Sequence, residues 1–342
     1  MRPVFDLRSD TVTVPTAAMR AAMAAAEVGD DVMREDPTVE ALQRRAAELF
    51  GKPDALFVAS GTMGNQVCLG ALTRPGDEVL AEEQAHILWH EVGSAARLWG
   101  LQIRLLPGRR GLMDPDDVAA AVRDRGDVHN PFTTMLSLEN THNFAGGVVL
   151  PLDYIDRMVA VAREHGLRLH MDGARIFNAQ VASGQPVARI VRDMDLVSVC
   201  LSKGLGAPVG SLVVGSTELI AECRRLRKAL GGGMRQVGVL AAAAAIALEE
   251  GPGLMVHDHR RARALAEELA VLPGCGIDLD TVQTNIVICD VPGDAFGYEP
   301  RFAALGVKLF AIDKRRLRFV FHRDVGDDAL DAAVSAARKL FG

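Results

Sequence analysis

The chain has few of the features that mark secreted, membrane or nucleic-acid-binding proteins. It has only five cysteines in 342 residues, without the Cys-x-x-Cys spacing of a zinc site, so we expect neither a metal centre nor a disulfide framework. No apolar run reaches the roughly 18 residues of a membrane-spanning helix, and residues 1–6 lack the apolar segment of a signal peptide. The net charge of −6 gives no reason to expect binding to nucleic acid or membranes. We therefore expect a cytoplasmic protein in a reducing compartment.

Lysine is also scarce, which narrows the search for a catalytic amine. The chain has 38 Lys and Arg residues, and few of them are lysines. Lys203 directly follows the apolar residues 196–201 and precedes Gly204-Leu205-Gly206. Lysine is seldom buried without a partner or a purpose, and the small neighbours leave room for a planar cofactor beside the backbone. The alternative is an exposed lysine at a strand end; the other lysines, Lys228 partly excepted, lie where solvation explains them.

A second apolar segment ends at an aspartate. Residues 169–171 lead into Asp172, and Arg175 follows three residues later. We expect both segments to be buried strands, each ending in one charged group. An aspartate for a pyridinium nitrogen and a lysine for a Schiff base are what pyridoxal phosphate (PLP) requires of a protein. Alone, Asp172 could equally be a metal ligand or a helix cap, and Arg175 could reach the cofactor's phenolic oxygen or a substrate carboxylate.

Two further patterns fit a phosphate-bearing cofactor, although each has a simpler explanation. Ser60-Gly61-Thr62 follows a predicted strand and opens a predicted helix, where backbone N–H groups suit an anion; an ordinary N-cap is the commoner explanation. Gly231-Gly232-Gly233 is flanked by Lys228 and Arg235, either of which could meet a phosphate, but the glycines could simply end the preceding helix.

Two histidines are spaced four residues apart on a helix that we predict over residues 86–98. His86 and His90 have the spacing of metal ligands, but no third ligand is evident in the nearby sequence, so we expect no zinc. An imidazole can instead stack on a flat cofactor ring. An ordinary surface histidine is the alternative, and it suits His90 better than His86.

The order of predicted elements indicates an α/β fold with a second, smaller domain. Helical and strand patterns alternate through the first two-thirds of the chain, which predicts a mostly parallel sheet with helices on both faces. The strands are expected at residues 55–59, 78–81, 134–138, 169–172, 196–201 and 211–215. We place the domain change near Gly251-Pro252-Gly253, giving a large domain over 1–250 and a small α+β domain over 251–342. A helix over 254–270, strands over 285–289 and 317–321 and a closing helix would form the small domain.

Taken together, the motifs resemble the PLP-dependent low-specificity L-threonine aldolases, of the β-eliminating lyase group with the aspartate-aminotransferase-like fold, fold type I. The resemblance covers nearly the whole chain and is strongest before residue 250. The matching motifs lie at residues 6–13, 28–32, 137–143, 171–179, 201–206, 208–211 and 231–236.

The resemblance implies a PLP site in the large domain. Lys203 would be the Schiff-base lysine, Asp172 would pair with the pyridine nitrogen, and His86 would stack on the ring. The phosphate would be held by Gly61, Thr62 and Ser202, together with Lys228 and Arg235 from a neighbouring subunit. That last role implies a homodimer with shared active sites, usually paired into a tetramer.

The resemblance also implies the reaction and its substrate site. Ser9, in an N-terminal arm over residues 1–16, would bind the substrate carboxylate with Arg175 and Arg318. His129 would lie near the β-substituent, and either His86 or His129, directly or through water, would be the base. We expect reversible aldol cleavage of L-threonine, L-allo-threonine and related β-hydroxy-α-amino acids to glycine and an aldehyde, which is acetaldehyde from threonine.

Two departures from the family pattern bear on substrate preference rather than on the core chemistry. Met33 stands where the family often has tyrosine, and Ile87-Leu88-Trp89-His90 is bulkier than the usual pattern. The alternatives are β-elimination or transamination on the same scaffold, a PLP-binding protein without turnover, and an α/β enzyme without PLP.

Overall fold

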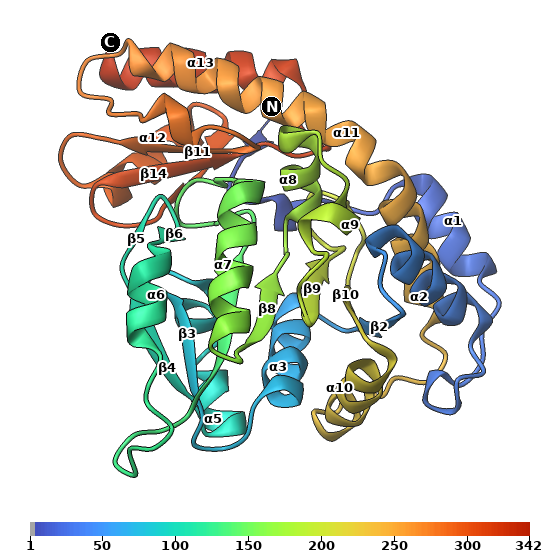
Figure 1. The fold of residues 1–342 in the computed structure, drawn as a ribbon. Coiled ribbons are helices and arrows are strands. Elements are labelled where there is room, and N and C mark those ends of the chain that lie inside the picture. Colours follow the sequence, from blue (N-terminus) through green and yellow to red (C-terminus); the bar gives the residue numbers. More distant parts are fainter. Residues whose placement is uncertain (1–3) are drawn as a thin grey trace.

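A computed structural model describes residues 4–342 as two domains, each with its own sheet (Figure 1). The larger domain has a seven-stranded sheet and the smaller one a three-stranded sheet. Alternate residues of the edge strand β2 (Asp54–Val58) contribute to separate hydrophobic clusters on the two faces of the large sheet, Phe57 to one and Leu56 to the other. This burial on both faces explains the continuous apolar runs and confirms the predicted α/β fold with a mostly parallel sheet.

The large sheet has the strand order β2-β10-β9-β8-β7-β3-β4, and only β10 is antiparallel to its neighbours. After β2, the strands in that order are β10 (Ser211–Gly215), β9 (Leu196–Cys200), β8 (Arg168–Asp172), β7 (Thr133–Glu139), β3 (Glu78–Glu82) and β4 (Gln102–Leu106). The sequence prediction missed β4, because this edge strand carries Gln102 and Arg104 and is only partly buried.

Helices cover both faces of the large sheet. One face carries α3 (Gly61–Leu72), α4 (His86–Trp89), α5 (Ser94–Trp99) and α10 (Thr217–Ala229), whose apolar residues share one cluster. The other carries α1 (Ala17–Ala25), α2 (Pro37–Phe50), α6 (Pro115–Ala121), α7 (Leu152–Glu164), α8 (Ile176–Ser183), α9 (Val187–Ile190) and the first half of α11 (Gly238–Ala270).

The small domain packs α12 (Tyr298–Ala304), α13 (Asp327–Phe341) and the second half of α11 on an antiparallel sheet. Its strand order is β11 (Ile286–Asp290), β14 (Arg316–Val320), β13 (Phe310–Ala311). The N-terminal arm joins this domain, because β1 (Phe5–Asp6) pairs in parallel with β12 (Val307–Lys308) and Leu7 is part of the small core. The first three residues of the predicted arm lie outside the described residues.

The helix α11 runs without interruption through the predicted domain change. We expected a helix to begin at residue 254, after Pro252, and the structure instead begins it at Gly238 and continues it for 33 residues. A proline removes one backbone donor, but here both halves of the helix are held by burial, Ala244 in the large core and Leu265 in the small one. By length and composition α11 could cross a membrane; since its apolar residues line both cores, we interpret it as a core helix that connects the domains.

The predicted helix over residues 86–98 is also different in the structure. It is divided into α4 and α5, and the chain between them turns at Val92 and Gly93, which both have positive φ. This break places Glu91 inside the protein with no exposed surface. His86 begins α4 and His90 follows its end, so the two do not share one continuous helix.

Candidate active site

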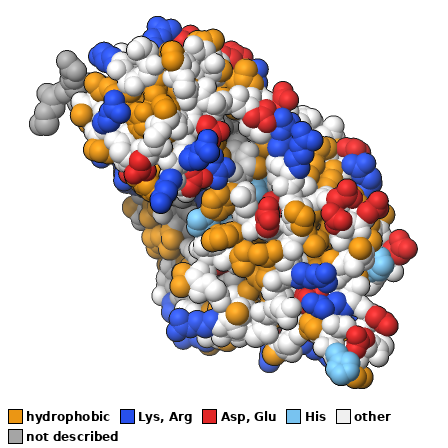
Figure 2. All heavy atoms as spheres, turned by 90° about the vertical axis from the view of Figure 1, so that its left-hand side faces the viewer, with side chains coloured by type: hydrophobic (Ala, Val, Ile, Leu, Met, Phe, Trp, Pro, Cys, Tyr) orange, Lys and Arg blue, Asp and Glu red, His pale blue; other side chains and the backbone are white. Residues whose placement is uncertain are grey.

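A cavity of about 280 Å³ lies where the arm and the small domain meet the large sheet. Figure 2 views the molecule from this side, with basic (blue) and histidine (pale blue) side chains between the small domain above and the large domain below. The residues that line the cavity are Ser9, Thr11, His86, His90, Asn143, Arg175, Lys203 and Arg318. Segments up to 309 positions apart in sequence therefore meet at one site, and five of the predicted site residues are among them.

Asp172 ends β8 next to this cavity and is almost fully buried. Its Oδ1 accepts from the backbone N–H of Ala174 at 3.0 Å, and its Oδ2 accepts from the amide of Asn65 at 2.7 Å. Burial opposes ionisation, but the nearby His86 and Lys203 charges outweigh it and hold the pKa of Asp172 below its ordinary value. The site thus contains a buried, ionised carboxylate, which is the partner that a protonated pyridine nitrogen needs.

Lys203 lies in the loop after β9, and its side chain lines the cavity. The arm holds the backbone at this point, because Thr13 Oγ1 donates to the carbonyl oxygen of Lys203 at 3.0 Å. The preceding residue, Ser202, is half-buried in the same loop.

The N-terminus of α3 packs tightly against the end of β9. A Cβ atom at Gly61 would lie 2.5 Å from the Sγ atom of Cys200, so only glycine allows this approach. Ser60 caps the helix by accepting from the N–H of Met63 at 3.1 Å, and Thr62 follows in the first turn. Close packing of a helix N-terminus beside the lysine loop suits a phosphate group, so these residues fit the cofactor that the sequence indicates.

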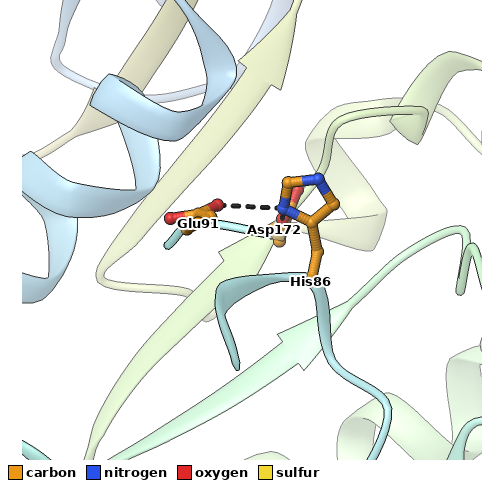
Figure 3. Close-up of side chains that lie close together, drawn as sticks. All are labelled: His86, Glu91 and Asp172. Atoms are coloured by element: carbon orange, nitrogen blue, oxygen red, sulfur yellow. Dashed lines mark hydrogen bonds and ion pairs between the residues drawn. The ribbon is translucent and has the colours of Figure 1, made fainter. Parts of the chain in front are cut away.

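His86 is held by two carboxylates at the edge of the cavity (Figure 3). Its Nδ1 lies 2.9 Å from Oε1 of Glu91 and 4.0 Å from Oδ2 of Asp172. Its backbone N–H donates to Glu139 Oε2 at 2.8 Å. Burial favours the neutral ring, but the Glu91 hydrogen bond and the Asp172 charge outweigh it, so the pKa of His86 is raised.

The potential ligand atoms of His86, Glu91 and Asp172 all lie within 4.8 Å of one another. We interpret them as a hydrogen-bond network rather than a metal site. The Nδ1 atom faces Glu91 at hydrogen-bond distance, and one amide group, that of Asn65, donates to both carboxylates at 2.7 Å.

The two arginines of the cavity differ in their hydrogen-bond partners. Arg175 forms a bidentate ion pair with the buried Asp10, through Nε and Nη2 at 2.7 Å each, and its Nη1 donates to Asn143 at 3.1 Å. Arg318, from β14, has no carboxylate within 4 Å in residues 4–342; it reaches only Asn143 Oδ1 at 3.4 Å and the Arg8 carbonyl at 3.3 Å, and its Nε has no partner. Burial lowers the pKa of Arg318 to about 10, which leaves it charged at neutral pH. Arg318 is therefore the guanidinium available to an anionic ligand, and Arg175 is committed to Asp10.

Three of the predicted residues that do not line this cavity belong to exposed parts of the surface. His129 lies exposed in the loop between α6 and β7, where its backbone N–H donates to Asp127. Lys228 is exposed at the end of α10, and Arg235 is exposed and forms an ion pair with Asp30 at 2.9 Å. Their expected roles require a second copy of the chain and stay predictions.

Sequence reasoning missed four residues that hold the site together: Asp10, Asn65, Glu91 and Asn143. Asp10 and Asn143 belong to motifs that carried the resemblance, 6–13 and 137–143, but no role was assigned to them. For Glu91 the available signal was the following Val92-Gly93, since a glycine after an apparent helix turn can mark a break.

Comparisons with known proteins agree with this geometry. Residues 6–292 match the family described as beta-eliminating lyase. The chain is 47% identical to a probable low-specificity L-threonine aldolase 2 of Arabidopsis thaliana, over 98% of this chain and 97% of that protein. It is 42% identical to the low specificity L-threonine aldolase of Escherichia coli K12, over 99% of both chains. A solved threonine aldolase structure from Leishmania major superposes with a TM-score of 0.85 at 20% identity, over 98% of this chain and 99% of that one, which shows the shared fold.

Proposed function

The chain belongs to the beta-eliminating lyase family, and from that premise we propose that it cleaves L-threonine and related β-hydroxy-α-amino acids to glycine and an aldehyde. It is an aldehyde-lyase that depends on PLP. The observation that carries the substrate assignment is the half-buried Arg318 guanidinium, which lines the cavity with Lys203 and has no carboxylate partner in the described chain. An amino acid brings the missing carboxylate.

The described residues would hold the cofactor at four points. Lys203 would hold its aldehyde carbon, Asp172 its pyridine nitrogen, and His86 would lie against the ring. The start of α3, at Gly61 and Thr62, would hold the phosphate together with Ser202. When bound, PLP supplies a sink for the electron pair left on Cα after the Cα–Cβ bond breaks.

Arg318 sets the orientation of the substrate. Its planar fork suits a bidentate carboxylate contact, and Ser9 lies beside it in the cavity wall. Fixing the carboxylate decides which bond at Cα stands perpendicular to the cofactor ring, and that alignment determines which bond breaks. Arg175 supports this arrangement indirectly, because its pair with Asp10 anchors the arm that carries Ser9.

Removal of the β-hydroxyl proton requires a base, and we assign it to His86. Its Nδ1 faces Glu91, so its Nε2 is the atom left to accept a proton from a ligand in the cavity. General-base assistance of this kind contributes about 10²–10⁴-fold. His129 is the second candidate, and it would act from another copy of the chain.

We also propose a homodimer with shared sites, paired into a tetramer. Large apolar side chains are exposed near the residues that need a second copy: Val128 and Phe132 flank His129, and Met33 follows Asp30, the partner of Arg235. Light scattering of the purified protein tests this oligomeric state.

We propose a cytoplasmic location for the protein. Its five free cysteines suit a reducing compartment, and imaging of a tagged chain tests the location.

Product analysis of the PLP-loaded protein tests the function. L-threonine should give equal amounts of glycine and acetaldehyde. Pyruvate and ammonia from L-serine or L-cysteine, without aldehyde from threonine, would instead identify β-elimination, and an amino acceptor requirement would identify transamination. A kinetic comparison of L-threonine, L-allo-threonine and β-phenylserine then defines the β-substituent preference.

A further inference from the structure

Glu91 is a buried carboxylate that none of the predicted roles uses, yet it is the centre of a hydrogen-bond network behind the active site. Its Oε1 accepts from Asn65 Nδ2 at 2.7 Å and faces His86 Nδ1 at 2.9 Å, and its Oε2 accepts from Gln66 Nε2 at 2.7 Å. Asn65 Nδ2 also donates to Asp172 Oδ2 at 2.7 Å. One amide thus joins Glu91 to the carboxylate that would hold the pyridine nitrogen.

The hydrogen-bond donors around Glu91 determine which ring nitrogen of His86 carries the proton. Both oxygens of Glu91 face amide NH₂ groups, which can only donate. The Glu91 side chain is therefore the acceptor on every side, and the Nδ1 atom of His86 must carry the proton that points to it. This leaves the Nε2 atom of the neutral ring with its lone pair.

We propose that Glu91 is a positioning residue for the aldol cleavage, which fixes the Nδ1–H tautomer of His86 and raises the basicity of Nε2. The inference rests on the proposed function, in which His86 accepts the β-hydroxyl proton. Glu91 touches neither substrate nor cofactor and acts only through His86 and, by way of Asn65, through Asp172. A carboxylate that orients a histidine from the opposite ring nitrogen is an established arrangement in proton transfer.

Several charged or titratable groups besides Glu91 face the His86 ring. They limit how far removal of the Glu91 charge can lower the pKa of His86. These are Asp172 at the end of β8, Glu139 at the end of β7, Lys203 after β9 and the neighbouring His90, whose ring centroid is 5.3 Å away. The two other carboxylates stabilise an imidazolium, and Lys203 opposes it. Removing the Glu91 charge therefore leaves His86 less basic but still within an acidic surrounding.

The substitution Glu91→Gln tests this with little structural change. The Gln oxygen can replace Oε1 and accept from both His86 and Asn65. Its NH₂ would then face Gln66, whose amide can turn over and present its own oxygen, which has no partner within residues 4–342. The variant keeps the tautomer and the packing and removes only the charge.

The experiment compares PLP-loaded wild type and Glu91→Gln in two measurements. In the pH profile of kcat/KM for L-threonine, the acid limb should move down by about one pH unit, since the limb reports protonation of the free base. The plateau should fall about tenfold, because a weaker base accepts a proton less readily. In ¹⁵N spectra of histidine-labelled protein, assigned with His86→Asn, the His86 titration should move by the same amount while Nδ1 stays protonated.

Glu82→Gln is the matched control, because Glu82 Oε2 forms a second buried carboxylate–imidazole contact with His142, at 3.0 Å, that does not line the cavity. It should move the His142 signals and leave the acid limb at its wild-type position. An acid limb that stays at its wild-type position in Glu91→Gln overturns the proposal, whether or not the His86 signals move. If wild type fails to cleave threonine, the proposed function fails, and the His86 spectra still decide whether Glu91 holds the tautomer.

Discussion

The two walls of the active-site cavity are built on different principles. The large-domain wall (His86, Asp172 and Lys203) stands on the ends of adjoining strands of one sheet and on the short helix α4, and its carboxylate is fully hydrogen-bonded within the protein. The arm wall (Ser9, Asp10 and Arg318) is assembled from the N-terminal arm and the small domain, and within residues 4–342 its Arg318 guanidinium has no carboxylate partner. The first wall is complete before any ligand arrives; the second is completed by the substrate.

The two walls therefore have different tasks: one holds the groups that carry out the chemistry, and the other determines which substrate bond reacts. The large-domain wall holds the groups that a cofactor needs, and the rigid sheet fixes their spacing. The arm wall orients the substrate, and its geometry depends on how the small domain and the arm sit on the large sheet. Substitutions in the two walls should therefore fail in different ways.

The largest effect should come from the large-domain wall, at Lys203. In Lys203→Ala, kcat/KM for L-threonine should fall by at least about 10³-fold, because the group that holds the cofactor and takes part in the reaction is gone. The visible absorption of the covalently bound cofactor should disappear with it.

Borohydride fixation and peptide mapping check the assignment, since wild type should carry the label on the peptide containing Lys203. Lys314→Ala, an exposed lysine of the small domain, is the control and should retain activity. A label on any other lysine would show that the large-domain wall is centred elsewhere.

The next effect separates the two arginines. Arg318→Gln should lower kcat/KM for L-threonine about 10²-fold, mostly through a higher KM, because charge-assisted contacts to the carboxylate are lost. The free energy of unfolding should stay near the wild-type value, since no protein carboxylate loses a partner.

Arg175→Gln should instead destabilise the fold by about 3–5 kcal/mol, because it leaves the buried Asp10 carboxylate unpaired. Urea unfolding monitored alongside kinetics distinguishes the two variants. Equal destabilisation by both substitutions would mean that Arg318 also supports the fold. The proposed contrast between Arg175, which is paired with Asp10, and Arg318, which is available to a substrate, would then be wrong.

A third test concerns the charge balance behind the arm wall. Asp258, on α11, is buried, and its nearest cation is Arg261 at 3.5 Å. Burial, only partly offset by Arg261 and reinforced by Asp10, raises the pKa of Asp258 to about 7. The unfolded chain has a pKa near 3.9 at this residue, so between these values the native state binds more protons and stability falls as pH rises.

Asp258→Asn removes this dependence. Relative to the variant, wild type should lose about 2–4 kcal/mol of unfolding free energy between pH 4 and pH 8, with little further change at higher pH. Urea titrations at four or five pH values measure the difference. Parallel stability profiles for the two proteins would show that folding does not raise the pKa of Asp258.

The two walls differ in how many of their residues could be predicted from the sequence, because they are built from different elements. Asp172 and Lys203 could be found because each follows an apolar run whose burial fixes a strand, and parallel strands bring their ends together. Glu91 was missed because the helical periodicity of residues 86–98 outweighed the one local sign of a break, the glycine at position 93. For the arm wall, the family resemblance implied Ser9 and Arg318, but which arginine is paired with Asp10 is decided by folding in three dimensions.

The smallest effect should arise where the two walls meet. A second cavity, of about 230 Å³, shares His90, Asn143 and Arg318 with the first and is otherwise lined by Phe144 and by residues 310–312 of the small domain. The rings of His90 and Phe144 stack with centroids 5.0 Å apart and planes 7° apart, which gives the cavity a flat aromatic side. Its position and apolar lining suit the β-substituent of a substrate whose carboxylate is on Arg318.

Phe144→Ala should therefore change substrate preference more than turnover. We expect kcat/KM for β-phenylserine to fall about tenfold, the size of one lost aromatic contact and its buried area. The value for L-threonine should stay within about twofold, because its methyl group has much less apolar surface than a phenyl ring. Phe296→Ala, an exposed phenylalanine of the small domain, is the control and should leave both values unchanged. The measurement is the ratio of the two constants in each variant. An equal fall for both substrates would show that Phe144 supports the junction of the walls and does not select the β-substituent.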